Sequence, residues 1–231
     1  MANANPLSER WHALQERIAR ACAQSGRDPQ SLRIVAVSKG VPPERIQHAY
    51  ALGIRDFGEN YWQEAREKIP LLPDDIRWHF IGHLQTNKVK YVVGRFALIQ
   101  SVDRAELLQE IQQRALKLGI VQPVLIEVRL SEGPTRAGAP VAQTPALVEQ
   151  ALQMPNIALQ GLMGLAPYTE QEAPIRRAFQ TLRALFEQLP EANRLWLSMG
   201  MSHDFEIAIQ EGATMLRIGT ALFGERHEQG G

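Results

Sequence analysis

Eight short apolar runs alternate with amphipathic helical segments along this chain of 231 residues, and no other feature restricts the fold as strongly. The predicted strands are 32–39, 54–60, 77–83, 96–103, 123–130, 157–166, 194–201 and 214–224. The helices expected between them are 43–52, 61–69, 86–93, 104–118, 141–153, 171–188 and 203–211. Such alternation indicates parallel βαβ units, and eight of these with right-handed crossovers close into a barrel. The sequence therefore predicts an α/β protein, a single (β/α)₈ TIM-type barrel.

The alternative fold is an open doubly wound sheet. Sheets of that kind that bind dinucleotides carry a GxGxxG turn after the first strand. In this chain the first predicted strand ends in Ser38-Lys39-Gly40 instead. The barrel is the better prediction.

An amphipathic helix of roughly 7–25 precedes the first strand. Leu7, Trp11, Leu14, Ile18 and Cys22 recur at helical spacing between charged residues, and Gly26 follows. We expect this helix to pack on the barrel, the tail 225–231 to be flexible, and residues 1–231 to form one domain.

Composition excludes several classes of function. Lys plus Arg and Asp plus Glu number 25 each, so a broad nucleic-acid surface is not expected. The single cysteine, Cys22, cannot form an internal disulfide, which fits a reducing compartment. No apolar run approaches the roughly 20 residues of a membrane span, and MANANPLSER does not resemble a signal peptide. We therefore expect a cytoplasmic protein that binds neither membranes nor nucleic acid.

Polar residues gather at the ends of the predicted strands, where barrels build their active sites. They are Lys39, Glu59, Asn60, His83, Ser101, Asp103, Arg129, Ser198, Ser202, Arg217, Gly219 and Thr220. A lysine buried at such a place can be held as a neutral amine that attacks a carbonyl. The alternative is a lysine at the rim whose ammonium reaches water.

The last predicted strand, LRIGTALFG, favours the first interpretation. It carries Arg217 within an apolar run, Gly219 where a ligand can approach the backbone, and the hydroxyl of Thr220. Barrels often bind phosphate near the loops after strands seven and eight, and Ser202 is a plausible N-cap of the helix 203–211. A lysine that seeks a carbonyl, opposite a phosphate site, points to pyridoxal 5′-phosphate (PLP).

Other polar residues carry less weight. His79 and His83 lie four apart on a strand with no acid between them, so we expect no HExxH zinc site and place His79 in the core or behind the site. Arg136 is expected to reach over the barrel mouth. Lys88 and Lys90 indicate a solvated helix face. A third interpretation is a regulatory protein that contacts its partner through Trp62 or through this helix.

The segments that carry this argument also resemble a known family. AVSKGVPPE, DFGENYWQEAREK, RWHFIGHLQTNK, GLMGLAP, LSMGMSHDFEIAI and LRIGTALFG look like signature segments of the pyridoxal phosphate homeostasis proteins, in the expected order from about Leu32 to Phe223. That family is similar to the N-terminal barrel of alanine racemase. Here Gly40, His203 and the RAG of LSEGPTRAG depart from the more usual residues.

The resemblance implies a site for PLP. Lys39 would form the internal aldimine, Asn60 would lie beside the ring, and Met201 would line the site. Ser202, Gly219 and Thr220 would hold the phosphate, and Arg217 would face the pyridine nitrogen. The resemblance thus implies PLP as the cofactor and no metal ion in the site.

The resemblance also implies a function without an established reaction. Members of the family are regarded as carriers or homeostasis factors for PLP. An arginine against the pyridine nitrogen weakens the ring as an electron sink. We expect a monomer that buffers or delivers PLP, with amino acids and PLP-dependent apo-enzymes as further partners. The alternative is an amino-acid racemase or a Schiff-base aldolase of low activity.

Overall fold

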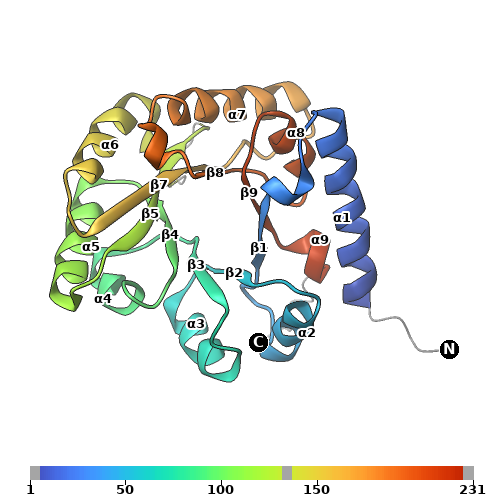
Figure 1. The fold of residues 1–231 in the computed structure, drawn as a ribbon, viewed down its shortest axis with the longest axis horizontal. Helices are drawn as coiled ribbons and strands as arrows, with labels where there is room; N and C mark the ends of the chain where they lie inside the picture. Colours follow the sequence, from blue (N-terminus) through green and yellow to red (C-terminus); the bar gives the residue numbers. More distant parts are fainter. Residues whose placement is uncertain (1–5, 132–136, 226–231) are drawn as a thin grey trace.

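Eight parallel strands close into a barrel in the computed structural model, which describes residues 6–131 and 137–225 (Figure 1). The strands are β1 (Arg33–Val37), β2 (Asp56–Glu59), β3 (Arg77–Phe80), β4 (Leu98–Val102), β5 (Gln122–Arg129), β7 (Ile157–Gly164), β8 (Trp196–Ser198) and β9 (Met215–Ile218). Each pairs in parallel with the next, and β9 pairs with β1. A two-residue strand, β6 (Ala139–Pro140), lies beside β5. The predicted barrel is confirmed.

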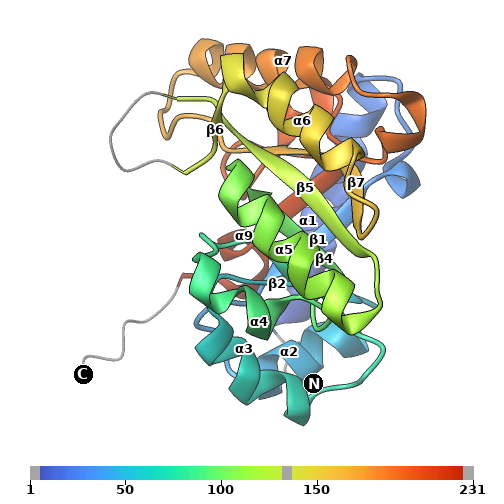
Figure 2. The same cartoon turned by 90° about the vertical axis from the view of Figure 1, so that its left-hand side faces the viewer.

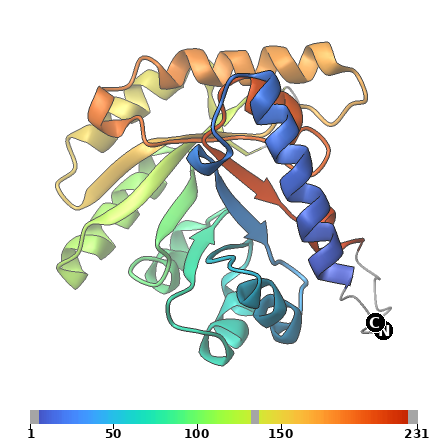
Figure 3. The ribbon, with the colours of Figure 1, turned by 45° about the vertical axis from the view of Figure 1, so that its right-hand side comes forward.

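Helices surround the barrel. They are α1 (Pro6–Gln24), α2 (Pro43–Ala51), α3 (Trp62–Lys68), α4 (Val89–Val92), α5 (Ala105–Leu118), α6 (Thr144–Leu152), α7 (Glu172–Phe186), α8 (Phe205–Gln210) and α9 (Thr220–Phe223). Figure 2 shows α5 and α6 on the outer side of β5. Figure 3 shows the predicted N-terminal helix, α1, lying across α8 and α9. Its buried residues Leu7, Leu14, Ile18 and Cys22 form the expected stripe.

The core has two parts. The larger part fills the space between the strands and the helices around them, as burial of one face of every helix requires. The smaller part lies within the barrel and consists of Val35, Leu98, Leu125, Met163 and Met215. Buried polar side chains also lie there, among them His79, Gln100, Ser198 and Arg217. In most barrels branched apolar residues dominate the interior.

The last predicted strand, 214–224, was wrong in its second half. β9 ends at Ile218, and residues 220–223 form the short helix α9 with Gly219 at its start. The backbone of Gly219, at φ −113° and ψ −81°, leaves the extended conformation, and its carbonyl accepts the amides of Leu222 and Phe223. A run of apolar residues does not by itself distinguish a buried strand from a buried turn of helix.

Two further expectations concern the ends and loops. Residues 226–231 of the tail and Arg136 lie outside the described residues. Within the described parts of the chain, no helix is both long and apolar enough to pass through a membrane.

Candidate functional site

The predicted site residues converge on one end of the barrel because the carboxyl ends of parallel strands meet there. Lys39 follows β1 and Asn60 follows β2, a pair of neighbouring strands. Met201 and Ser202 follow β8, whereas Gly219 and Thr220 follow β9, which pairs with both β8 and β1. The side chain of Arg217 comes from β9 itself.

Lys39 stands at the second position of a tight turn. The amide of Val41 donates to the carbonyl of Ser38 over 2.9 Å, which closes the turn around Lys39 and Gly40. Gly40 has a φ of +69°, a conformation that residues with a Cβ seldom adopt. Glycine at position 40 therefore suits the backbone of this chain. Lys39 is partly exposed.

A buried ionic cluster holds this turn from behind. The ammonium of Lys68, on α3, donates to the carbonyl of Ser38 over 2.7 Å, to Glu59 Oε1 over 2.9 Å and to Glu64 Oε1. The hydroxyl of Ser38 donates to Glu59 Oε1 over 2.6 Å, and the amide of Gly40 donates to Glu64 Oε1. Glu59 is fully buried, and this burial raises the pKa of its carboxyl group. Both residues that flank Lys39 are thus bound by one cluster.

Arg217 is a buried cation inside the barrel, with 3% of its surface exposed. Its guanidinium donates to the hydroxyl of Ser198 over 2.6 Å and to the carbonyl of Gly164 over 2.9 Å. Burial lowers the pKa of Arg217 to about 10, against the opposing effect of Glu127 and Asp204. The side chain therefore stays charged at neutral pH.

A chain of hydrogen bonds leads from Arg217 across the barrel. The hydroxyl of Ser198 donates to Gln100 Oε1 over 2.7 Å, and Gln100 Nε2 lies 3.0 Å from His79 Nδ1. His79 Nε2 lies 3.0 Å from Asp56 Oδ1. Burial lowers the pKa of His79, so the ring is neutral. Since Gln100 Nε2 is a donor, His79 Nδ1 accepts and Nε2–H donates to Asp56.

His79 is buried within this chain of hydrogen bonds, in agreement with the prediction of a place in the core or behind the site. Asp56 also binds Arg33 and Arg77. Burial acts to raise the pKa of its carboxyl group, but the hydrogen bonds from His79 and Arg77 outweigh burial and hold the pKa well below its usual range. Among the described residues, no group of three or more His, Cys, Asp or Glu side chains could hold a metal ion.

The predicted phosphate residues lie around the start of α9. The hydroxyl of Ser202 accepts the amide of Ala221 over 3.1 Å, which leaves its proton for another acceptor. Thr220 is exposed at the first position of α9, beside Gly219. The prediction that Ser202 caps the helix 203–211 was wrong, because α8 begins at Phe205 with Asp204 at its N-cap. Asp204 instead accepts the amide of Met201 over 2.6 Å.

The sequence reasoning missed Glu127, on β5. Its side chain is buried, with 4% of the residue exposed. Burial raises the pKa of Glu127 to about 7, nearby Asp103 raises it further, and Arg217 opposes the shift. The available signal was a single acidic residue inside the apolar run PVLIEVRL. It also missed Glu59 and Lys68 as a pair, since they come from different elements.

The remaining candidates make contacts with one another or with their neighbours in the chain. Asp103 Oδ1 binds Arg104 over 2.6 Å, and His83 Nδ1 lies 4.0 Å from Asp103 Oδ2. Trp62 stacks on Tyr91 at 5.9 Å, and Lys88 and Lys90 lie over the ring of Tyr91. At the rim, Tyr168 is 80% exposed and meets the ring of His203 edge on.

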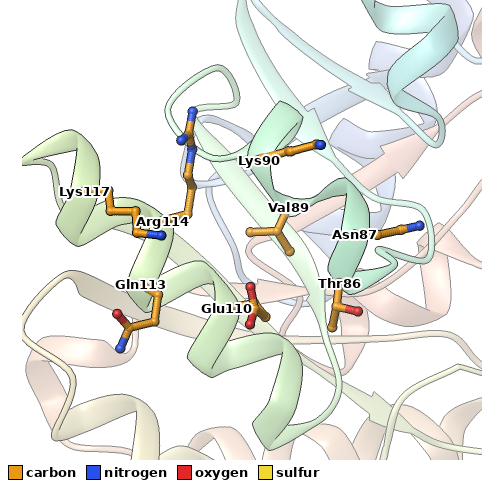
Figure 4. A pocket seen from close by; sticks show the side chains of 8 residues that line it. All are labelled: Thr86, Asn87, Val89, Lys90, Glu110, Gln113, Arg114 and Lys117. Atoms are coloured by element: carbon orange, nitrogen blue, oxygen red, sulfur yellow. The ribbon is translucent and has the colours of Figure 1, made fainter.

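The polar side chains that line a surface hollow beside α5 do not converge on a common point. It lies between Thr86–Lys90 and α5, and Figure 4 shows its lining side chains. Lys90 points away from Arg114 and Lys117, which come from the opposite helix (Figure 4). The three cations thus do not face a common point, and we assign no ligand to this hollow.

Comparison with known proteins identifies the class. The family model for the alanine racemase N-terminal domain matches residues 11–227, so the chain belongs to that family. It is 47% identical over 222 residues to a pyridoxal phosphate homeostasis protein of Aquifex aeolicus, covering 94% of this chain and 97% of that protein. It is 41% identical over 222 residues to the protein of the same name in Pseudomonas aeruginosa, covering 95% and 96%. Within the class, the chain therefore belongs to the pyridoxal phosphate homeostasis proteins.

A solved structure agrees with this assignment. PipY of Synechococcus elongatus PCC7942, solved with PLP bound, superposes with a TM-score of 0.77 at 37% identity. The match covers 91% of this chain and 99% of PipY. The predicted family is confirmed.

Proposed function

We propose that this chain binds PLP reversibly and serves in cofactor homeostasis as a buffer or carrier. One observation carries the proposal: Lys39, on a turn closed by a hydrogen bond, and the buried cation Arg217 come from the same end of the barrel. The names of the relatives and the PLP bound to PipY support it.

The donor groups of the site suit PLP. Lys39 supplies the amine for the aldehyde. The hydroxyls of Ser202 and Thr220 supply donors for the phosphate. Gly219 has no side chain that would keep the phosphate away from the backbone. Asn60 and Met201 would line the ring, and Arg217 would face the pyridine nitrogen.

Arg217 favours a carrier over a catalyst. Bound PLP supplies an aldehyde that amines capture reversibly and a ring that withdraws electrons. The guanidinium of Arg217 remains protonated at neutral pH and offers no acceptor, so it cannot stabilise a proton on the ring nitrogen. The ring then withdraws electrons less strongly, which disfavours reactions at the α-carbon of an amino acid.

The test is a visible absorption spectrum followed by a transfer assay. Loaded protein should absorb near the blue edge of the visible range and lose that band on addition of borohydride. When a dialysis membrane separates the loaded protein from a PLP-dependent apo-enzyme, the released PLP should cross the membrane and restore the activity of that enzyme. Protein that takes up no PLP would remove the proposal.

An amino-acid racemase or Schiff-base aldolase of low activity is the second candidate, and Glu127 favours it. Either reaction needs an acid or base besides Lys39. Glu127 interacts electrostatically with Arg217 and has a pKa of about 7, so it is a group of that kind inside the barrel. Chiral analysis of amino acids incubated with loaded protein distinguishes this candidate from a carrier.

We further propose the cellular setting. The chain acts as a monomer in the cytoplasm, residues 1–231 form one PLP-binding domain, and amino acids and apo-enzymes exchange PLP with it. The buried, unpaired Cys22 supports a reducing compartment. Light scattering of the eluting protein tests the oligomeric state.

A further inference from the structure

Lys68 is a buried lysine for which the proposed function has no use. Only 6% of the residue is exposed, although lysine is among the residues that proteins bury least. Its ammonium is met by three acceptors from three elements. They are the carbonyl of Ser38 after β1, Glu59 at the end of β2, and Glu64 one turn earlier on α3. A buried cation with this many partners is held in one position.

Lys68, Glu59 and Glu64 each bind a residue that flanks Lys39 in the turn. On one side of Lys39, Ser38 binds Lys68 through its carbonyl and Glu59 through its hydroxyl. On the other side, the amide of Gly40 binds Glu64. Three bonds therefore fix the two peptide neighbours of Lys39, and charge assistance makes each of them stronger than a neutral hydrogen bond.

The charges of the cluster do not cancel. Two carboxylates share one ammonium, so the cluster carries a net charge of −1 when all three groups are ionised. In addition, Glu59 Oε2 is buried and has no hydrogen-bond partner among the described residues. A carboxylate without its cation favours the protonated form of a nearby amine, so Lys68 limits the effect of Glu64, the less buried of the two carboxylates, on Lys39.

We infer that Lys68 is a positioning residue for Lys39, which it serves by anchoring the turn and by balancing Glu59 and Glu64 behind it. This inference rests on the proposed use of Lys39 as the amine that binds PLP. The ionisable groups that the described contacts place against Lys68 are Glu59, from β2, and Glu64, from its own helix.

The test measures the amine of Lys39 in the absence of PLP. Formaldehyde with a borohydride donor methylates neutral lysine amines, and mass spectrometry of the peptide that contains Lys39 gives the extent of labelling at each pH. In Lys68→Met the partly exposed carboxylate of Glu64 loses its cation, so the midpoint of labelling should rise, by up to about one pH unit. That is about a tenfold loss of neutral amine at a fixed lower pH.

A second variant should shift the midpoint in the opposite direction. Glu64→Gln removes one negative charge but keeps an oxygen that can accept the amide of Gly40, so labelling of Lys39 should begin at lower pH. Glu64 is partly exposed, and this variant is expected to fold even where Lys68→Met does not. General damage to the barrel would not move the two midpoints in opposite directions.

Matched controls use exposed residues of the same types. Lys90→Met and Glu67→Gln make the same chemical changes at exposed positions and should leave the midpoint of Lys39 unchanged. An unchanged midpoint in Lys68→Met, or a shift of the same sign in both cluster variants, overturns the inference. Failure of the wild-type protein to take up PLP would refute the proposed function instead, and the methylation result would stand apart from it.

Discussion

Arg217 donates to the hydroxyl of Ser198 over 2.6 Å inside the barrel, and both residues are buried. The guanidinium thus binds a hydroxyl and a carbonyl rather than a carboxylate. Through Gln100 and His79, the hydrogen bonds continue to Asp56. The orientation of the cation therefore depends on neutral groups that are themselves held in a fixed order of donors and acceptors.

Ser198→Ala should destabilise the protein by about 1–3 kcal/mol, because it leaves donors of Arg217 and an acceptor of Gln100 buried without partners. Urea denaturation measures this loss. Ser31→Ala is the control, since Ser31 is exposed and its removal should change the free energy of unfolding by no more than about 0.5 kcal/mol. Equal effects of the two substitutions would contradict the role of the chain of hydrogen bonds.

Borohydride reduction of PLP-loaded protein should fix one phosphopyridoxyl group on Lys39. The reason is the placement of Lys39 at the carboxyl end of β1, on a turn held from both sides. Peptide mapping by mass spectrometry locates the label, and Lys39→Ala should lose the visible band. A label on another lysine of the wild-type protein would show that the site is misassigned.

Thr220→Ala should weaken the binding of PLP by roughly tenfold or more. A hydrogen bond to a charged group contributes about 1.5–3 kcal/mol, and about 1.4 kcal/mol corresponds to a factor of ten in the dissociation constant. Unphosphorylated pyridoxal should bind almost as before. Fluorescence titration with both ligands measures the difference, and equal weakening of both would mean that Thr220 acts through packing of α9.

Glu127 should make the stability of the protein depend on pH. Its pKa is raised in the folded state, from 4.5 to about 7, so folding binds a proton between these values. The contribution to stability is fully present below about pH 4.5 and is lost as the pH rises to about 7. The loss amounts to roughly 3 kcal/mol at 1.36 kcal/mol for each unit of pKa shift.

Glu127→Gln isolates this contribution because its side chain does not ionise. The difference in free energy of unfolding between variant and wild type should move in favour of the variant as the pH rises from 4.5 to 8. Urea denaturation at several pH values measures it. A difference that stays constant over this range would show that Glu127 has an ordinary pKa.

Amino acids should exchange onto the cofactor without efficient racemisation. Racemisation needs one group on each face of the α-carbon, and loss of a general acid or base typically costs about 10²–10⁴ in rate. Lys39 serves one face, and Arg217 keeps the ring a modest electron sink. Chiral chromatography of L-alanine incubated with loaded protein tests this. Multiple turnovers per second that disappear in both Lys39→Ala and Glu127→Gln would favour the racemase.

The barrel, and the end of it at which the candidate site residues meet, could be predicted from the sequence because the signals are local. Periodicity of apolar residues marks each strand and helix, and the turn after β1 is legible in Ser38-Lys39-Gly40. The same reasoning overextended the last strand into α9, because a short apolar run has no period that separates the two structures. The carboxyl ends of strands then bring Lys39, Asn60, Ser202 and Arg217 to one end of the barrel.

Only the tertiary structure decided how these residues are supported. Lys68 lies in the polar segment WQEAREK, and its contact with Ser38 spans 30 positions of the chain. The bond from Ser198 to Gln100 spans 98 positions. Glu127 acquires its raised pKa only from burial and from nearby Asp103, which together outweigh the opposing effect of Arg217. Local patterns report whether a residue faces inward, but the partner that it meets, and hence its charge state, depends on closure of the barrel.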